Sequence, residues 1–280
     1  MTYFINLRAQ SVGGDPAADV TVSGTSSIAD LVEMIRGKDV LLGTHGFNVD
    51  MAHGISSLSL WESMLSLGAN TVFIGVLWPG DSAWLPVIDY PFEGNEATRS
   101  GQLLARFLNS HFTEAASLSF VSHSLGARMV LETIRQLNPD RRVSDLSIMA
   151  GAIDDDCLTD EYRDAAGKVD SISLLSSHGD YVLEFAFPIG NLLGGIISRG
   201  HPYWHAALGR EGPETVNGVH LHSGGWQIPD GWKFGHGDYL PGMPGVPMAI
   251  PVNVPPQSTP LPAGLNKSAW SAGFVSTRLG

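Results

Sequence analysis

The segment FVSHSLGAR, residues 120–128, places Ser124 between an apolar run and a run with helical periodicity. A serine at a strand-to-helix turn has its hydroxyl lifted clear of the sheet, and the amides that follow it point toward the same side. Ser122 and Gly126, two positions before and after it, are small enough for such a crowded turn. The pattern favours nucleophilic chemistry by Ser124, although simple capping of the following helix explains the same residues.

Two neighbours of Ser124 are weaker candidates for a direct part in this chemistry. Ser122 falls inside the predicted strand, which makes it a poor nucleophile. His123 adjoins Ser124, but neighbouring side chains at such a turn point apart. We therefore expect His123 to line the pocket and a different histidine to act as the base.

A second motif, LLGTHGFNV, ends an earlier apolar run with His45, Gly46 and Phe47. A loop at this place can supply a backbone N–H to a developing oxyanion, and glycine lets the chain come close to the reacting atoms. We assign one such donor to Phe47 and the other to Leu125. An ordinary turn after a strand is the alternative for this motif.

Short apolar runs alternate with helical patterns along the chain, which predicts a mostly parallel sheet with helices on both faces. We expect strands at residues 3–7, 39–46, 71–78, 118–123, 146–153 and 172–177. We expect helices at residues 27–36, capped by Ser26 or Ser27, and at 55–68, 95–112, 125–137 and 160–167. In the second helix, one face should carry Ile55, Leu58, Trp61, Met64 and Leu65.

The rest of the chain departs from this alternation. Residues 185–235 are rich in glycine and aromatic residues, which fits an insertion or lid over a site, and residues 241–262 hold eight of the 17 prolines. Proline excludes regular helix and interior strand. We predict one domain at 1–240 and a proline-rich tail at 241–280 that packs on it.

Composition limits the classes of partner and compartment. The chain carries 28 acidic and 16 basic residues, a formal net charge of −12, and no cluster of lysine and arginine, which argues against a nucleic-acid partner. Cys157 is the single cysteine, so no intrachain disulfide forms, and we find neither a signal peptide nor an apolar run of about 18 residues. We expect a cytoplasmic protein, without a membrane span, that acts on a small molecule; the oligomeric state stays open.

The residues from about 40 to 136, with THGFNV, LWPG and SHSLGAR, resemble the α/β-hydrolase superfamily. Within it they are most similar to a bacterial family described only as alpha/beta hydrolases of unknown function, in which HGFN and HSMGNR stand at these places. The resemblance implies the α/β-hydrolase fold. It also implies a catalytic triad that follows the chain order serine, acid, histidine.

The resemblance directs the search for an acid to the loops after the later strands. Asp180 follows the apolar run ISLLSS, whereas Asp154 and Asp155 follow the run before it. The superfamily usually places the acid after the later strand, so we favour Asp180. Asp154 and Asp155 remain alternatives, and carboxylates at a solvated helix start explain them as well.

The base should come late in the chain. His236, in FGHGDYL, lies in a glycine-flanked loop and resembles the terminal histidine segment of the family. His220 and His222 are rivals, but they alternate in what resembles a strand and fit a structural role better. His236 would take the proton of Ser124, and Asp180 would hold the imidazole in its tautomer.

Further side chains are candidates for substrate contacts or for a metal. We expect His45, His123, Trp78 and Tyr181 to contact substrate, and tryptophans near loop ends to favour an apolar cleft, namely Trp78, Trp84, Trp204, Trp226 and Trp232. His201 and His205 have metal-ligand spacing, but no glutamate follows His201 as zinc peptidases require. We expect no metal and no cofactor.

These observations predict a serine carboxylesterase that cleaves small to medium apolar acyl or aryl esters through an acyl-enzyme. Lipases, thioesterases, amidases and acyltransferases use the same residues, because pocket shape decides among them. A binding module of this fold without turnover is the second hypothesis, and a metallohydrolase that uses the late histidines is the third.

Overall fold

The computed structural model of the 280-residue chain describes residues 1–12, 14–80, 90–184, 206–222, 226–242 and 262–279. Eight strands form one sheet in the order β2-β1-β4-β3-β5-β6-β7-β8. β1 and β2 pair antiparallel and all other pairs are parallel. The strands are β1 (Tyr3–Arg8), β2 (Pro16–Ser23), β3 (Asp39–Thr44), β4 (Thr71–Leu77), β5 (Ser117–His123), β6 (Val143–Met149), β7 (Val169–Ser176) and β8 (Trp226–Gln227). The predicted α/β class, with a mostly parallel sheet, is confirmed.

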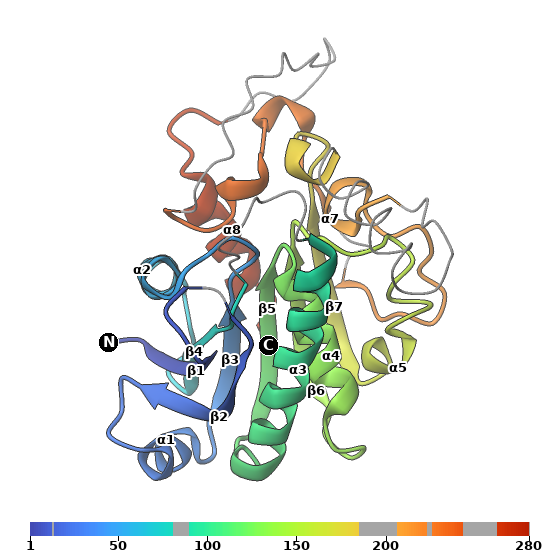
Figure 1. The fold of residues 1–280 in the computed structure, drawn as a ribbon. Helices are drawn as coiled ribbons and strands as arrows, with labels where there is room; N and C mark the ends of the chain where they lie inside the picture. The colour runs from blue at the N-terminus through green and yellow to red at the C-terminus, as the bar shows by residue number, and fades with distance from the viewer. Residues whose placement is uncertain (13, 81–89, 185–205, 223–225, 243–261, 280) are drawn as a thin grey trace.

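Helices follow most of the strands, as the sequence pattern predicted (Figure 1). They are α1 (Ile28–Ile35), α2 (Met51–Glu62), α3 (Tyr90–His111), α4 (Gly126–Gln136), α5 (Arg163–Ala166), α7 (Leu208–Glu211) and α8 (Lys267–Ser276). Ser27 caps α1 by accepting a hydrogen bond from Asp30 N–H, which confirms one of the two predicted caps.

The order of the strands changes direction at β3, because β4 lies on one side of β3 and β5 on the other. Right-handed crossovers therefore put α2 on the face opposite to α3 and α4. The contacts agree with this rule, since α3 packs on α4 while α2 packs on α8. In open α/β sheets, ligands bind outside the carboxyl ends of the strands at such a reversal. The loops after β3 and β5 begin there.

The central strands are buried on both faces. In β3, the adjacent residues Leu41 and Leu42 are both at most 1% exposed, although their side chains point to opposite faces of the sheet. Helices must therefore cover both faces, which explains why the sequence shows continuous apolar runs here.

The helix predicted at residues 55–68 is displaced in the structure. α2 begins at Met51, after Asp50 accepts a hydrogen bond from His53 N–H at 2.8 Å, and ends at Glu62. Leu58 and Trp61 are buried, but Ile55 is 37% exposed. The predicted face was therefore wrong for Ile55, because the buried side of α2 is formed by Gly54, Ser57, Leu58 and Trp61.

Four elements were not predicted, namely β2, β8, α7 and α8. β2 pairs antiparallel with the first strand, yet half of its residues are exposed, so its composition carries no apolar signal. α8 lies within the predicted proline-rich tail, after the last proline, and buries Ala272, Phe274 and Val275. The extended path expected for residues 241–262 lies almost wholly outside the described residues.

The predicted insertion is described only in part. Residues 206–222 and 226–235 are described, whereas 185–205 and 223–225 are not, so the proposed lid stays a prediction, as does the boundary at residue 240. Within the described residues, no helix is both long and apolar enough to cross a membrane.

Candidate active site

Ser124 lies at a sharp bend between β5 and α4. β5 ends at His123, α4 begins at Gly126, and Ser124 has a φ of 55°. This left-handed conformation costs a non-glycine residue about 1–3 kcal/mol and occurs mostly at functional sites. The N-cap of α4 is Leu125, with no side-chain capping bond. The explanation of Ser124 as a helix cap is therefore wrong.

Backbone hydrogen bonds hold the bend against the end of β6. The Ser124 N–H donates to the Met149 carbonyl at 3.0 Å, and the Ser124 carbonyl accepts from the Ala127 and Ala152 amides at 3.1 Å each. The strained conformation is thus fixed by its neighbours on both sides.

His236 and Asp180 complete a hydrogen-bonded chain with Ser124. His236 Nε2 lies 2.7 Å from Ser124 Oγ, and His236 Nδ1 lies 2.8 Å from Asp180 Oδ2. An ionised carboxylate accepts hydrogen bonds only, so Nδ1 carries the proton and Nε2 accepts from the serine hydroxyl. The structure therefore brings together the three residues predicted as nucleophile, base and acid.

The acid is fully buried, while the base keeps some access to solvent. Asp180 is 0% exposed and its Oδ1 accepts from the Leu183 amide at 3.1 Å, whereas the His236 side chain is 17% exposed. Each carboxylate oxygen thus has a partner, which fixes the carboxylate plane and so the imidazole that it holds.

The alternative acids lie elsewhere. The Asp155 N–H donates to the Ala206 carbonyl at 3.0 Å, and Asp154 forms an isolated β-bridge with Ala207. These contacts tie the loop after β6 to residues 206–207. Asp180, which follows β7, is the aspartate that the structure places on His236.

The alternative histidines are also placed away from Ser124 or are not described. The His220 carbonyl accepts from Ile172 N–H at 2.7 Å, in the middle of β7 and not at its carboxyl end. Residues 220 and 222 flank an isolated bridge, so the strand expected for them is wrong. His201 and His205 lie outside the described residues.

Two glycines bring the loop after β3 against the serine. A Cβ atom on Gly46 would lie 2.5 Å from Ser124 Cβ and 3.1 Å from Ser124 Oγ, and a Cβ on Gly126 would lie 2.5 Å from the His45 carbonyl oxygen. Real Cβ atoms essentially never come that close, so only glycine fits at either position. The backbone at Gly46 therefore passes close to the serine hydroxyl, and the donor role of the next residue, Phe47, stays a prediction.

His45 and Trp78 were expected to contact substrate, and the structure corrects this. Both side chains are 0% exposed. Trp78 Nε1 donates to the His45 carbonyl at 2.9 Å, and the two rings stack with centroids 5.9 Å apart. Burial, the largest cause, lowers the pKa of His45 to about 4, so the ring is neutral at pH 7. These contacts join His45, at the start of the loop after β3, to Trp78, the residue after β4.

His123 was also expected to line the pocket, and it instead supports the base. Its Nε2–H donates to the His236 carbonyl at 2.7 Å, and the two rings lie 4.9 Å apart. The side chain is buried, and burial followed by the charge of His236 lowers the pKa of His123 to about 3. A neutral ring with its proton on Nε2 can make this bond throughout the physiological range.

Tyr181, the fourth expected contact, follows Asp180 in a helical turn and is partly exposed. Burial and the neighbouring Glu184 raise the pKa of its hydroxyl. Its contact with substrate stays a prediction. Of the tryptophans expected to form a cleft, Trp78 is buried, and Trp232 packs on Trp270 with centroids 5.3 Å apart.

Ser177, which joins the loop of the acid to the loop of the base, was not predicted from the sequence. Ser177 Oγ donates to the Phe234 carbonyl at 2.8 Å and accepts from the Gly179 amide at 3.2 Å. A serine three residues before the acid has no distinctive spacing, so only the fold reveals its role.

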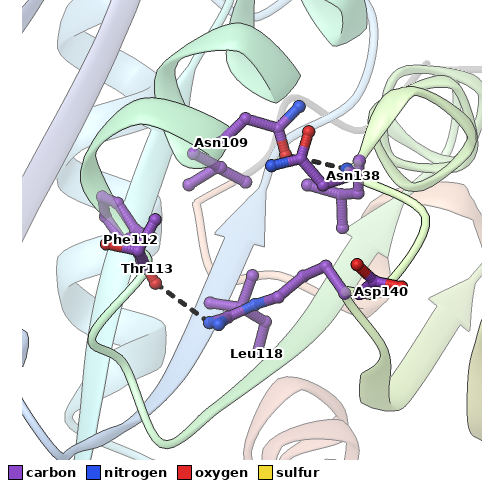
Figure 2. Close-up of a pocket in the computed structure, with 9 residues that line it drawn as sticks. Asn109, Phe112, Thr113, Leu118, Asn138 and Asp140 are labelled. Carbon is purple, nitrogen blue, oxygen red and sulfur yellow. Dashed lines mark hydrogen bonds between the residues drawn. The ribbon is translucent and has the colours of Figure 1, made fainter.

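The cavity in Figure 2 lies at the other end of the sheet. It has a volume of about 250 Å³ and is lined by the end of α3, the start of β5 and the segment after α4. Arg141 is one of its lining residues, and its guanidinium donates to the Phe112 carbonyl at 3.0 Å. β5 runs from Leu118 in the cavity wall to the bend at Ser124, so its whole length separates the cavity from the serine.

No cluster of three or more histidine, cysteine, aspartate or glutamate side chains that could hold a metal occurs in the part of the chain that the structure describes. Ser124, His236 and Asp180 can by themselves activate a hydroxyl for attack on an electrophilic carbon.

A family model described as "Alpha/beta hydrolase of unknown function (DUF900)" matches residues 21–230, more than half of the chain. The matched range includes Ser124 and Asp180 and ends before His236. No curated protein matches the sequence significantly.

Three esterases are among the solved structures that match. The catalytic core domain of acetyl xylan esterase from Trichoderma reesei is 15% identical over 42% of this chain and 65% of that one, with a TM-score of 0.34. Esterase PE8 is 17% identical over 72% of this chain and 86% of that one, with a TM-score of 0.38. Acetyl xylan esterase 1 from Thermoanaerobacterium sp. JW/SL YS485 is 11% identical over 84% and 82%, with a TM-score of 0.39.

Proposed function

Since the chain belongs to this family of alpha/beta hydrolases of unknown function, we propose that it is a serine hydrolase that cleaves carboxylic esters at Ser124. The observation that carries the proposal is the continuous hydrogen-bonded chain from Ser124 Oγ through His236 to Asp180, with contacts of 2.7 and 2.8 Å. A serine with only a structural role would not require a buried carboxylate that hydrogen-bonds the imidazole in contact with its hydroxyl.

In the first half-reaction, Ser124 Oγ attacks the ester carbonyl carbon as its proton passes to His236 Nε2. The carbonyl π electrons move to oxygen and form a tetrahedral oxyanion. As the oxyanion collapses, the bond to the alkoxy group breaks, and His236 gives its proton to the leaving alcohol. Asp180 stays ionised throughout and stabilises the imidazolium.

In the second half-reaction, water replaces the alcohol. His236 takes a proton from the water, whose oxygen attacks the acyl carbon, and the bond to Ser124 Oγ breaks as the serine recovers its proton. The products are one carboxylic acid and one alcohol. The remaining exposure of His236 (17%) is consistent with water reaching Nε2.

The amides of Phe47 and Leu125 are the proposed donors to the oxyanion. Leu125 directly follows the serine at the start of α4, where helix N–H groups point outward, and Gly46 lets the backbone before Phe47 approach Ser124 Oγ. One such donor typically lowers the barrier by about 3 kcal/mol.

The proposed substrates are small to medium esters with an apolar acyl or aryl group. Phe47, which is partly exposed and packs on the core beside the serine, supports this choice, as does the aromatic content of the loops. We further propose a cytoplasmic location, which agrees with the single, unpaired Cys157.

A fluorophosphonate probe followed by a panel of p-nitrophenyl esters of increasing chain length tests the function. We expect covalent labelling of the wild type at Ser124, no labelling of Ser124→Ala, and a kcat about 10⁴-fold lower for Asp180→Asn, which would hold the wrong tautomer. His236→Ala should lose about as much as Ser124→Ala.

Asp155→Asn is the matched control, because Asp155 follows the neighbouring strand and the carboxylate that contacts His236 Nδ1 is that of Asp180. It should label at the rate of the wild type. A folded wild type that neither labels nor hydrolyses any ester would refute the proposal and favour a binding module of the same fold.

A further inference from the structure

The segment that carries His236 has almost no regular structure of its own. Between residues 230 and 239 the chain forms only two single-turn 3₁₀ helices, Asp230–Trp232 and His236–Asp238. A segment without strand or helix hydrogen bonds must be held by other contacts if its imidazole is to stay within reach of a serine.

Side chains from three parts of the molecule supply these contacts. Ser177, beside the acid, donates to the Phe234 carbonyl, and His123, beside the nucleophile, donates to the His236 carbonyl. The third set comes from α8, which lies beyond the residues that the family model matches. Ser271 of α8 donates to the Tyr239 carbonyl at 2.6 Å.

Lys267, the first residue of α8, makes the charged contacts of this set. Its Nζ lies 2.6 Å from the Lys233 carbonyl oxygen and 2.6 Å from Asp238 Oδ2, and it sits 5.1 Å from the centroid of the Phe234 ring. The Lys267 side chain is 22% exposed, so water screens these interactions only in part.

Asp238 connects Lys267 to the segment that carries His236. The carboxylate oxygen that binds Lys267 also accepts the Gly235 N–H, at 2.7 Å, and Gly235 directly precedes His236. Lys267 Nζ therefore links the Lys233 carbonyl, through Asp238 Oδ2, to the N–H of Gly235. The ammonium group holds one end of the turn before the imidazole directly and the other end through Asp238.

We propose that Lys267 is a positioning residue for His236, so that α8 sets the distance between the imidazole and Ser124. The inference rests on the proposed hydrolase function. Lys267 contacts neither Ser124 nor substrate and acts through Asp238. A displacement of the base by about 1 Å can cost a hydrolase about 100-fold in rate, so a brace of this kind has a measurable effect.

Lys267→Met tests this, because it keeps the length of the side chain and removes the charge and the donors. We expect the rate of fluorophosphonate labelling and kcat for a p-nitrophenyl ester to fall together by about 10-fold to 100-fold, with KM nearly unchanged. Lys267→Arg should restore much of the rate, because it returns a cation to Asp238. In ¹H NMR, the downfield signal of the His236 Nδ1–H should broaden or shift in Lys267→Met.

Lys168→Met is the matched control. Lys168 Nζ also binds backbone carbonyls, those of Ile134, Arg135 and Leu137, but at the far end of α4 from the serine. It should lower the free energy of unfolding and leave the labelling rate of the folded protein intact.

Two results would overturn the inference while the proposed function stands. One is a Lys267→Met variant that is labelled at the wild-type rate with an unchanged Nδ1–H signal. The other is an equal loss of rate in Lys168→Met, which would mean that general destabilisation explains the effect. A wild type that is never labelled would remove the proposed function and, with it, this inference.

Discussion

The two loops that flank Ser124 are built in opposite ways. The loop after β3, which carries Gly46, is fixed by close packing, because a single added carbon would collide with the serine. The loop that carries His236 leaves space, since a Cβ on Gly235 would meet nothing nearer than Asp238 Oδ2 at 3.7 Å. That loop is instead fixed by hydrogen bonds from distant side chains. Shape thus holds one side of the nucleophile and polar contacts hold the other.

The packed loop also rests on a buried cation. Arg8, at the end of β1, is 4% exposed and donates to the Trp78 carbonyl at 2.8 Å and to the Val49 carbonyl at 3.1 Å. It therefore joins the loops after β3 and β4. Arg8 and Lys267 play parallel parts, but Arg8 is deeply buried and Lys267 is close to the surface. An added methyl group should therefore harm the Gly46 side more than the His236 side, whereas both sides should be harmed by the loss of the cation that braces them.

Among the substitutions that test this comparison, Gly46→Ala should have the largest effect on kcat. The new methyl group must push either the loop or Ser124 away, so the oxyanion donor proposed at Phe47 moves out of reach. We expect kcat for a p-nitrophenyl ester to fall about 100-fold to 1000-fold.

Gly94→Ala in α3 is the control, because a Cβ there meets nothing within 4 Å, and it should leave kcat intact. Gly235→Ala should cost less than Gly46→Ala. Equal losses in these two variants would erase the distinction between the packed loop and the hydrogen-bonded loop.

The next effect is on stability, from Arg8→Met. Removing the guanidinium takes the Arg8 donor from the buried Val49 carbonyl and leaves the Trp78 carbonyl with the Gly80 N–H, at a cost of about 3 kcal/mol in the free energy of unfolding. Urea unfolding measures this cost.

Arg36→Met, whose side chain is 52% exposed in a surface ion pair with Glu33, should change the free energy of unfolding by less than about 1 kcal/mol. If both variants unfold at the same urea concentration, the buried cation does not hold the Gly46 loop as described.

The most gradual effect is expected from pH. The folded-state pKa values of His45 and His123 are about 4 and about 3, below the value of 6.5 in the unfolded chain. The unfolded state therefore binds more protons below pH 6.5, and the stability that each neutral ring contributes is present above pH 6.5 and lost as pH falls toward its folded pKa.

Each ring should lower the free energy of unfolding by about 1.4 kcal/mol per pH unit in this range. His45→Gln and His123→Gln should each flatten the curve measured by urea unfolding between pH 7 and pH 4.5. A curve for His45→Gln that runs parallel to that of the wild type would show that His45 is not held neutral in the fold.

Sequence patterns predicted the parts of the molecule that depend on local chemistry. The apolar runs that become β3, β5 and β7 are strands buried on both faces, and residues that follow them, such as Ser124 and Asp180, were found at their carboxyl ends. The order of these motifs was enough to propose Ser124 and to name Asp154, Asp155 and Asp180 as candidate acids, because parallel strands bring their carboxyl ends to one edge. The resemblance to the α/β-hydrolase superfamily then favoured Asp180.

The predictions that failed or were missing concern residues whose roles depend on contacts between positions far apart in the sequence. His45 and Trp78 follow strands, just as substrate-contacting residues do, but each buries the other, and no pattern along the chain shows that. The contact of Lys267 with Asp238 spans 29 positions between two irregular segments. A lysine at a helix start is ordinary in sequence, and its role becomes visible only when the turn before His236 is in place.

The reversal of strand order at β3 has a consequence for how this scaffold can change over generations. In open α/β sheets a crevice forms at such a reversal because the helices on its two sides leave the sheet on opposite faces, as α2 and α4 do here, and this divergence follows from chain connectivity alone. Mutations in the surrounding loops can therefore reshape what enters the crevice without closing it. A chain with this connectivity keeps a place for new substrates even while it loses old ones.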